Sequence, residues 1–167
     1  MTATPAPPAL DGHWASVAPE DMGAMHATRA FAFDGERWQV RFCAFADAQA
    51  QLRLFTLEAG GVFRLGGPST VVPDAFEGIF PALYRRLCAD SDAGIALFAS
   101  QGGTLALGEP RDLVSESCGF VPALMQAMGE YDLVALREDQ LFLGDRSGDL
   151  TRSRPQCLTP FPLRRVA

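Results

Sequence analysis

The sequence predicts a mainly β fold, an antiparallel meander that closes into a barrel or half-barrel with one or two short helices. Two observations predict it. Apolar and polar residues alternate along several short, aromatic-rich segments, as in strands that bury one face. Turn residues separate these segments at regular spacing, and closing such a sheet removes its exposed edges.

Three hairpins carry this prediction. ATRAFAF and RWQVRFCAF flank Asp34-Gly35, and an Asp-Gly tip between alternating segments is the strongest short hairpin signal. QLRLFTL and VFRLGG flank a turn predicted at residues 58–61, and DLVALR and QLFLG flank Glu138-Asp139. Each hairpin adds two antiparallel strands to one sheet.

The middle of the chain leaves alternatives open. Residues 74–92 have apolar side chains at helical spacing, but Pro81 and Gly78 interrupt the pattern, so helix and strand both stay open there. GIALFAS and TLALGE are predicted strands around Gly102-Gly103, although GIALFA also fits a helix. CGFVPALMQAM fits one or two helical turns.

Length and composition indicate a single globular domain. The 167 residues are 48% hydrophobic, which fits residues 10–167 as one β-barrel-like domain after a disordered, Pro-rich lead-in at residues 1–9. No apolar run approaches the ~20 residues of a membrane helix, and the first residues lack the features of a signal peptide. We therefore expect no membrane span and a cytoplasmic location.

Charge and residue usage exclude several classes of function. The net charge of −6 argues against nucleic acid as a partner, because phosphate binding needs a basic surface. The chain contains no Lys, which excludes Schiff-base chemistry on its own side chains. No cofactor motif occurs. No metal site is expected either, because the Cys and His residues are scattered, at Cys43, Cys88, Cys118, Cys157, His13 and His26.

Five short motifs in order resemble one known family. LDGHWASVAPEDM and HATRAFAF come first, LFTLEAGGVFRLGGPSTVVPDAFEG and LALGEPRDLVSESCG follow, and EYDLVALREDQLFLGDR precedes an Arg-Pro. From Asp11 onward this order resembles the adenomatosis polyposis coli down-regulated protein domain, named for vertebrate Wnt antagonists. The resemblance implies a single lipocalin-like barrel of bacterial type, with a cavity for a hydrophobic ligand. The family's cysteines are absent near Ala18-Pro19 and Gln101-Gly102, so the extracellular role is not expected here.

The resemblance also gives a place to the arginine-rich segment GDRSGDLTRSRPQCLTPFPL. It would form the last connection and the closing strand. Its arginines, beginning with Arg146, would lie over the barrel mouth and contact a ligand, or would pair with surplus carboxylates.

Arg29 is the first candidate for ligand binding because it shares a strand face with Phe31 and Phe33. A guanidinium among aromatic rings would bind an anionic group where water is excluded. The alternative is a structural ion pair with Asp132 or Glu77. Trp38 and Phe42, on the neighbouring strand, are predicted to line the same cavity, or to pack the core.

Glu77 and Asp132 are the candidates for acid–base catalysis. Glu77 has apolar neighbours in sequence, and burial among them would raise the pKa of its carboxyl group. The alternative is a solvated face or an ion pair with Arg85 or Arg86. Asp132 opens the third hairpin, and the alternative there is a structural role.

These observations lead to three hypotheses. The first is a carrier that binds a small hydrophobic or amphipathic ligand in a barrel cavity. The second is a small barrel enzyme, an isomerase or cyclase with an acid–base mechanism, in a bacterial biosynthetic pathway. The third is a fully packed barrel that interacts with other proteins. The sequence leaves open whether the protein forms a homo-oligomer such as a homodimer.

Overall fold

The structure, a computed structural model, describes residues 3–127 and 129–167. Two short helices occur in this part of the chain, the α-helix α1 (Asp92–Ala99) and the 3₁₀ helix η1 (Leu124–Gln126). The strands are β1 (Gly12–Ser16), β2 (Glu20–Asp21), β3 (His26–Asp34), β4 (Arg37–Phe45), β5 (Arg53–Val62), β6 (Arg64–Pro68), β7 (Phe76–Ile79), β8 (Ala82–Ala89), β9 (Arg111–Asp112), β10 (Tyr131–Arg137), β11 (Gln140–Leu143) and β12 (Leu163–Val166).

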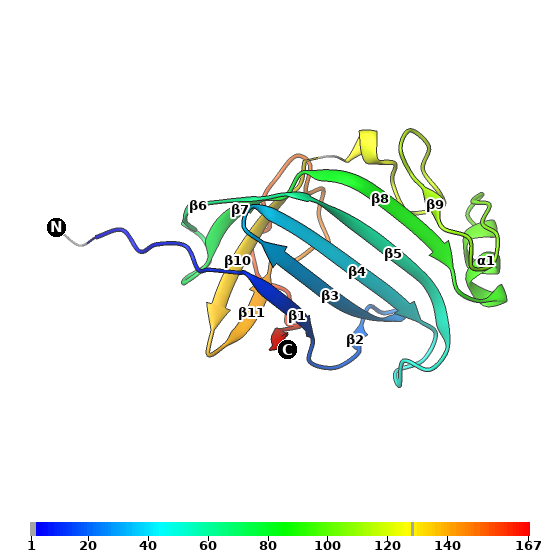
Figure 1. The fold of residues 1–167 in the computed structure, drawn as a ribbon, viewed down its shortest axis with the longest axis horizontal. Coiled ribbons are helices and arrows are strands. Elements are labelled where there is room, and N and C mark those ends of the chain that lie inside the picture. The colour runs from blue at the N-terminus through cyan, green and yellow to red at the C-terminus, as the bar shows by residue number, and fades with distance from the viewer. Residues whose placement is uncertain (1–2, 128) are drawn as a thin grey trace.

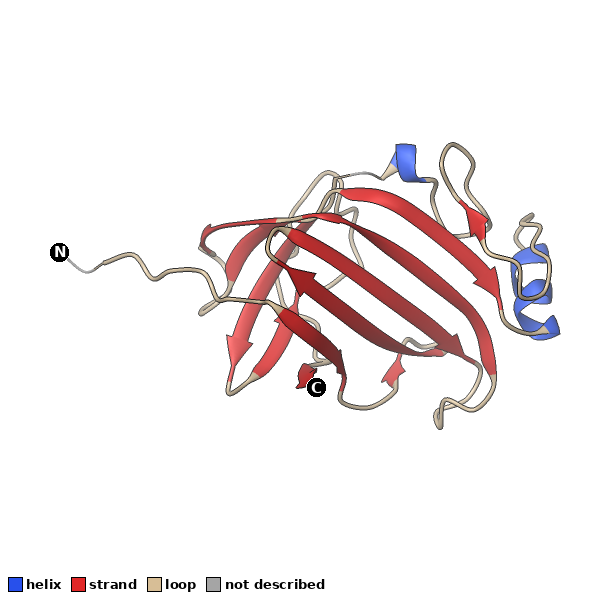
Figure 2. Ribbon diagram, viewed as in Figure 1, coloured by secondary structure: helices blue, strands red, loops and turns tan. Residues whose placement is uncertain are grey.

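All the strands of the described residues belong to one antiparallel sheet. Its hydrogen-bonded order is β6-β7-β10-β11-β12-β1-β3-β4-β5-β8-β9, and β2 pairs with β3 beside this path. The sheet curls into a half-barrel, and α1 lies at one end of it (Figures 1 and 2). The predicted mainly β, antiparallel fold is therefore confirmed.

One long bent hairpin produces the curl. β5 passes into β6 after Phe63 alone, and β7 passes into β8 after Phe80-Pro81. The two halves of this hairpin have different neighbours. In one half, β5 pairs with β8 and also with β4. In the other half, β7 pairs with β6 and also with β10. The hairpin thus connects the β4 side of the sheet to the β10 side.

The first and third predicted hairpins are confirmed. β3 and β4 pair from Asp34↔Arg37 onward. β10 and β11 meet at Arg137↔Gln140, and the tip residues Glu138 and Asp139 have φ values of 47° and 65°. Two successive positive φ values are typical of the type I′ turn, whose twist matches that of the strands.

The second predicted turn is wrong. β5 continues through residues 58–61, and the chain reverses only between β6 and β7. The two glycines there allow close contact between strands instead. A Cβ atom on Gly60 would lie 2.7 Å from the ring of Tyr84, and one on Gly61 would overlap the carbonyl of Pro81.

The structure settles the open middle segments. Residues 74–92 contain β7 and β8, not a helix, with Pro81 at the break where no amide donor is required. GIALFAS is the helix α1 and not the predicted strand, and the Ser91 side chain caps it by accepting from the amide of Gly94 at 3.1 Å. TLALGE contributes a single isolated bridge, between Leu107 and Ala89, and CGFVPALMQAM contributes η1. Met128 of that segment lies outside the described residues, as do residues 1–2 of the lead-in.

The last strand, β12, lies between β11 and β1, and it begins only at Leu163, the final residue of the arginine-rich segment, so that segment is mainly a connection. β12 pairs with β1 at His13↔Val166 and with β11 at Leu141↔Leu163. Residues 3–9 have no secondary structure and run away from the body (Figure 1).

Side chains fill the inside of the half-barrel. One cluster lies between β1, β3, β4, β5 and the β10–β12 side, and a second lies beneath α1. Burial of each large apolar side chain stabilises the fold by roughly 1.5–3 kcal/mol, so these clusters supply most of its stability. The first cluster contains Leu10, Trp14, Phe33, Trp38, Ala59, Phe80, Ala82, Val134, Leu141, Leu143 and Leu163.

Candidate functional site

The candidate site is a groove where the long hairpin bends. It has a volume of about 340 Å³, within the range of small-molecule sites. The two breaks in the hairpin and the neighbouring β3–β4 turn supply its walls. The lining residues are Glu36, Val62, Phe63, Arg64, Ile79 and Pro81.

Phe63 connects this groove to the aromatic core. Its ring stacks on Phe80 at 5.5 Å with an interplanar angle of 10°, and it meets the Phe33 ring edge-on at 5.3 Å. The side chain is nevertheless only half-buried, because the rest of it faces the groove. The groove therefore has a rigid aromatic wall.

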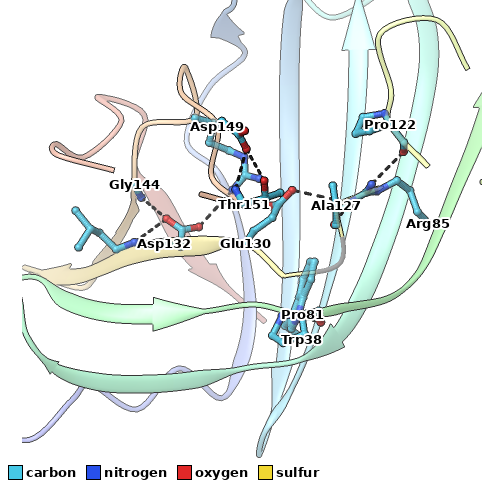
Figure 3. Close-up of polar contacts among 12 residues, drawn as sticks. Trp38, Pro81, Arg85, Pro122, Ala127, Glu130, Asp132, Gly144, Asp149 and Thr151 are labelled. Carbon is cyan, nitrogen blue, oxygen red and sulfur yellow. Dashed lines mark hydrogen bonds and ion pairs between the residues drawn. The ribbon is translucent and has the colours of Figure 1, made fainter. Parts of the chain in front are cut away.

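Trp38 fixes the two sides of the groove relative to each other. Its indole Nε1 donates to the carbonyl of Val62 at 2.9 Å and lies 3.3 Å from the carbonyl of Pro81. Both acceptors belong to lining residues, and Figure 3 shows Trp38 beside Pro81. A ligand that moved either strand would therefore change the environment of this indole.

Two opposite charges stand at the rim of the groove. Glu36 and Arg64 are both exposed. Ion pairs within the described part of the chain involve neither residue. The groove thus combines apolar walls with one carboxylate and one guanidinium that a ligand can reach.

The aromatic residues predicted to line an internal cavity pack against one another. Phe31 stacks on Phe33 at 5.8 Å, and Trp38 meets the Phe80 ring edge-on at 5.9 Å. Phe42 packs against the second cluster, with its ring 6.1 Å from that of Phe55. The structure therefore brings Phe31, Phe33 and Trp38 together but separates Phe42 from them.

Arg29 points into the half-barrel, as the alternation of β3 predicts, and its side chain is only 7% exposed. Its Nε donates to Glu20 at 2.9 Å, and its Nη2 donates to the carbonyl of Phe161. The Ser16 hydroxyl donates to the same carboxylate at 2.9 Å. Arg29 thus makes a structural ion pair, but with Glu20 and not with Asp132 or Glu77.

Glu20 had no signal in the sequence. It lies in the two-residue strand β2, which pairs with β3 at Glu20↔Ala27. The polar segment around it resembles an ordinary loop. Only the pairing of β2 with β3 turns its carboxylate towards Arg29.

Asp132 and Arg146 do come together. Asp132 is 4% exposed, and one of its oxygens accepts from the amides of Leu133 at 2.7 Å and Gly144 at 2.8 Å. Its other oxygen lies 3.3 Å from Arg146. Burial raises the pKa of the Asp132 carboxyl, while Arg146 and the two amides act in the opposite direction.

Arg146 extends this contact into a network that the sequence did not reveal. It also binds Glu130, whose other carboxylate oxygen lies 3.8 Å from Arg85. Arg85 is 7% exposed and donates to the carbonyl of Pro122 at 3.0 Å, and Ala127 provides a second carbonyl at 3.3 Å (Figure 3). Burial lowers the pKa of Arg85, and Glu130 opposes that effect.

Glu77 is connected to this network only indirectly, through Arg154, which also donates to the backbone carbonyl of Asp132 at 2.6 Å. It pairs with Leu133 on β10, its side chain is 43% exposed, and Arg154 lies 3.8 Å away. The apolar surroundings expected from its sequence neighbours are therefore not found. Neither Glu77 nor Asp132 lines the groove.

A second, smaller hollow does not suit nucleophilic chemistry. It measures about 80 Å³ and lies over the outer face of β5 and β8, where Cys88 contributes to it. Burial and Asp90 raise the pKa of this thiol, so the reactive thiolate is disfavoured.

Neither a metal site nor a membrane helix is found in residues 3–127 and 129–167. No three Asp, Glu, His or Cys side chains there group as metal ligands, and no helix there has the length and apolar character to cross a bilayer.

Comparison of the sequence with protein-family models and with curated proteins gave no match. The resemblance to the adenomatosis polyposis coli down-regulated protein domain therefore stays a prediction, as do the bacterial source, the cytoplasmic location and homo-oligomerisation.

Proposed function

We propose that this protein binds a small apolar or amphipathic molecule, as a carrier or binding protein, in the groove at the bend of the long hairpin. The supporting observation is the combination of four apolar lining residues with Glu36 and Arg64 at the rim. Apolar walls with a few polar groups that fix orientation are the usual composition of ligand sites. The groove replaces the internal cavity as the proposed site, because core side chains fill the space between the strands.

A groove-filling variant tests this function. Val62→Trp places a large side chain on an exposed lining position without removing the Val62 carbonyl that Trp38 uses. Val17→Trp is the matched control, because Val17 is exposed to a similar degree, 45% against 41%, and does not line the groove.

Native mass spectrometry of the gently purified protein, together with titration of the amphipathic anionic dye 1-anilinonaphthalene-8-sulfonate, provides the measurement. We expect bound small molecule or dye in the wild type and in Val17→Trp, and at least a tenfold weaker dye affinity in Val62→Trp. Equal dye affinity in all three proteins would contradict the proposed site.

The enzyme hypothesis has less support. Asp132 has a raised pKa, but its carboxylate oxygens contact two amides and Arg146, which occupy the positions that a substrate would need. Glu77 is half-exposed beside Arg154. A binding function requires neither group.

A further inference from the structure

The groove offers features that select among small amphipathic molecules. Phe63 presents an aromatic wall whose position is set by the stacked Phe80 ring and by the edge of Phe33. Aromatic rings gain about 0.5–1.5 kcal/mol from such arrangements beyond the area that they bury. A ligand with a planar ring would extend this series of rings, whereas an aliphatic chain would gain only from burial.

The two rim charges lie close together along the backbone. The amide of Phe63 donates to the carbonyl of Glu36 at 2.8 Å, and Arg64 follows Phe63 directly in β6. The carboxylate, the aromatic wall and the guanidinium therefore come from three residues joined by one hydrogen bond and one peptide bond.

Opposite charges on residues that line the same groove favour a ligand that carries both signs. Arg64 can bind a carboxylate through two parallel N–H donors, and Glu36 can accept from an ammonium group. A dianion would be repelled by Glu36, and a simple cation would be repelled by Arg64. A ligand that carries both a carboxylate and an ammonium group can pair with both residues.

Building on the proposed function of the groove, we infer that its ligand class is the aromatic zwitterion, a planar ring joined to adjacent ammonium and carboxylate groups as in an aromatic α-amino acid. The ring lies against Phe63, the carboxylate binds Arg64, and the ammonium binds Glu36. Val62, Ile79 and Pro81 enclose the remaining apolar surface. The modest volume of the groove suits a molecule of this size better than a long acyl chain.

A ligand series tests each feature separately. The probes are L-phenylalanine, 3-phenylpropionate without the ammonium group, phenethylamine without the carboxylate, and L-norleucine without the ring. Affinity is measured by isothermal titration calorimetry, and the fluorescence of Trp38 provides a second readout in a Trp14→Phe background. We expect L-phenylalanine to bind about tenfold more tightly than each of the other three probes.

Variants then assign the contacts. Arg64→Gln should abolish the preference for L-phenylalanine over phenethylamine, and Glu36→Gln should abolish its preference over 3-phenylpropionate. Arg41→Gln and Glu109→Gln are matched controls on exposed side chains outside the groove, and they should leave all four affinities unchanged. Phe63→Leu should remove the preference for L-phenylalanine over L-norleucine.

The outcomes separate the ligand class from the binding function. If L-norleucine binds as tightly as L-phenylalanine, or if Arg64→Gln leaves the order of affinities unchanged, the aromatic zwitterion is the wrong class. If none of the four probes binds but the dye still does, the class is again overturned while the binding function stands. If neither probes nor dye bind, both proposals fail. Because the ligand series uses the wild-type chain, a variant that unfolds does not remove the test.

Discussion

Two buried arginines inside the half-barrel have their charges balanced in different ways. Arg29 meets one carboxylate, Glu20, and the two side chains are only 7% and 2% exposed. Arg85 is equally buried, but its nearest carboxylate, Glu130, is shared with Arg146, which is 47% exposed. The first arrangement is an isolated pair, and the second is a network that reaches the surface.

The difference shows that the free-energy cost of removing a charged side chain depends on whether water can reach the partner that remains. Removing one member of the isolated pair leaves an uncompensated charge that water cannot reach. In the network, Glu130 keeps Arg146 as a partner when Arg85 is removed, and water can solvate Arg146. Substitutions should therefore be most damaging at Arg29 and progressively milder towards Arg146.

Arg29→Met should have the largest effect. It leaves Glu20 buried with only the Ser16 hydroxyl as a donor, and breaking a buried pair in this way destabilises proteins by about 3–5 kcal/mol. Urea denaturation followed by circular dichroism measures the loss. The double variant Arg29→Met/Glu20→Met should recover much of it, because no unpaired charge remains. A single-variant loss below about 1 kcal/mol would show that the pair is not isolated from water.

Arg85→Met should have an intermediate effect. It removes the donor to the carbonyls of Pro122 and Ala127, and hydrogen bonds from charged groups are worth about 1.5–3 kcal/mol. Glu130 retains Arg146, so no carboxylate is left unpaired. The neighbouring Arg86→Met, at a side chain that is 45% exposed, is the control and should change the free energy of unfolding little.

Arg146→Gln should cost less, about 1 kcal/mol, because half-exposed ion pairs are screened by water. Thermal unfolding at low and high salt measures it, and the difference from wild type should shrink at high salt. Arg152→Gln, at a side chain that is 87% exposed, should be neutral. A larger loss for Arg146→Gln than for Arg85→Met would reverse the proposed order.

Asp132→Asn should have its smallest effect in acid, where both side chains are neutral, and its signature is the pH dependence. Asn keeps an oxygen for the amides of Leu133 and Gly144 and imitates the protonated acid. Because burial raises the pKa of Asp132 in the folded state, its protonated form favours folding below the usual value of 3.8, and this contribution is lost as pH rises through the folded-state pKa.

The free energy of unfolding of wild type relative to Asp132→Asn should accordingly fall as pH increases from mildly acidic to neutral. Urea titrations of both proteins across that range measure the difference. A difference that instead grows with pH would indicate that Arg146 and the two amides dominate over burial.

Local signals in the sequence were sufficient for much of the sheet. The Asp34-Gly35 tip identified the β3–β4 hairpin, and the alternation of β3 put Arg29 on the inner face with Phe31 and Phe33. Arginines of the last connection pair with carboxylates, which was one of the two alternatives expected for them. Arg146 contacts Asp132 and Glu130, and Arg154 contacts Glu77. The first two inferences needed only neighbouring residues, whereas the expectation for these arginines came from the family resemblance.

Features that depend on packing between distant segments were missed. Gly60-Gly61 resembles a turn in sequence, but its function is set by Tyr84 and Pro81 on the opposite strand. The helix α1 was interpreted mainly as a strand, although Ser91 followed by Asp92 is a helix-start signal.

The groove was missed for a related reason. Its wall forms only where Phe63 and Pro81 interrupt two paired strands at the same level. An interruption of a strand is visible in the sequence, but the alignment of two interruptions is not.

The pairing of β12 with both β1 and β11 has a consequence for biosynthesis. Until residues 163–166 leave the ribosome, the edges of β1 and β11 lack their shared neighbour. Partners so distant in the chain associate slowly, and uncovered edges invite association with other nascent chains. The sheet can therefore be completed only once residues 163–166 are available, and the edges of β1 and β11 stay uncovered until then.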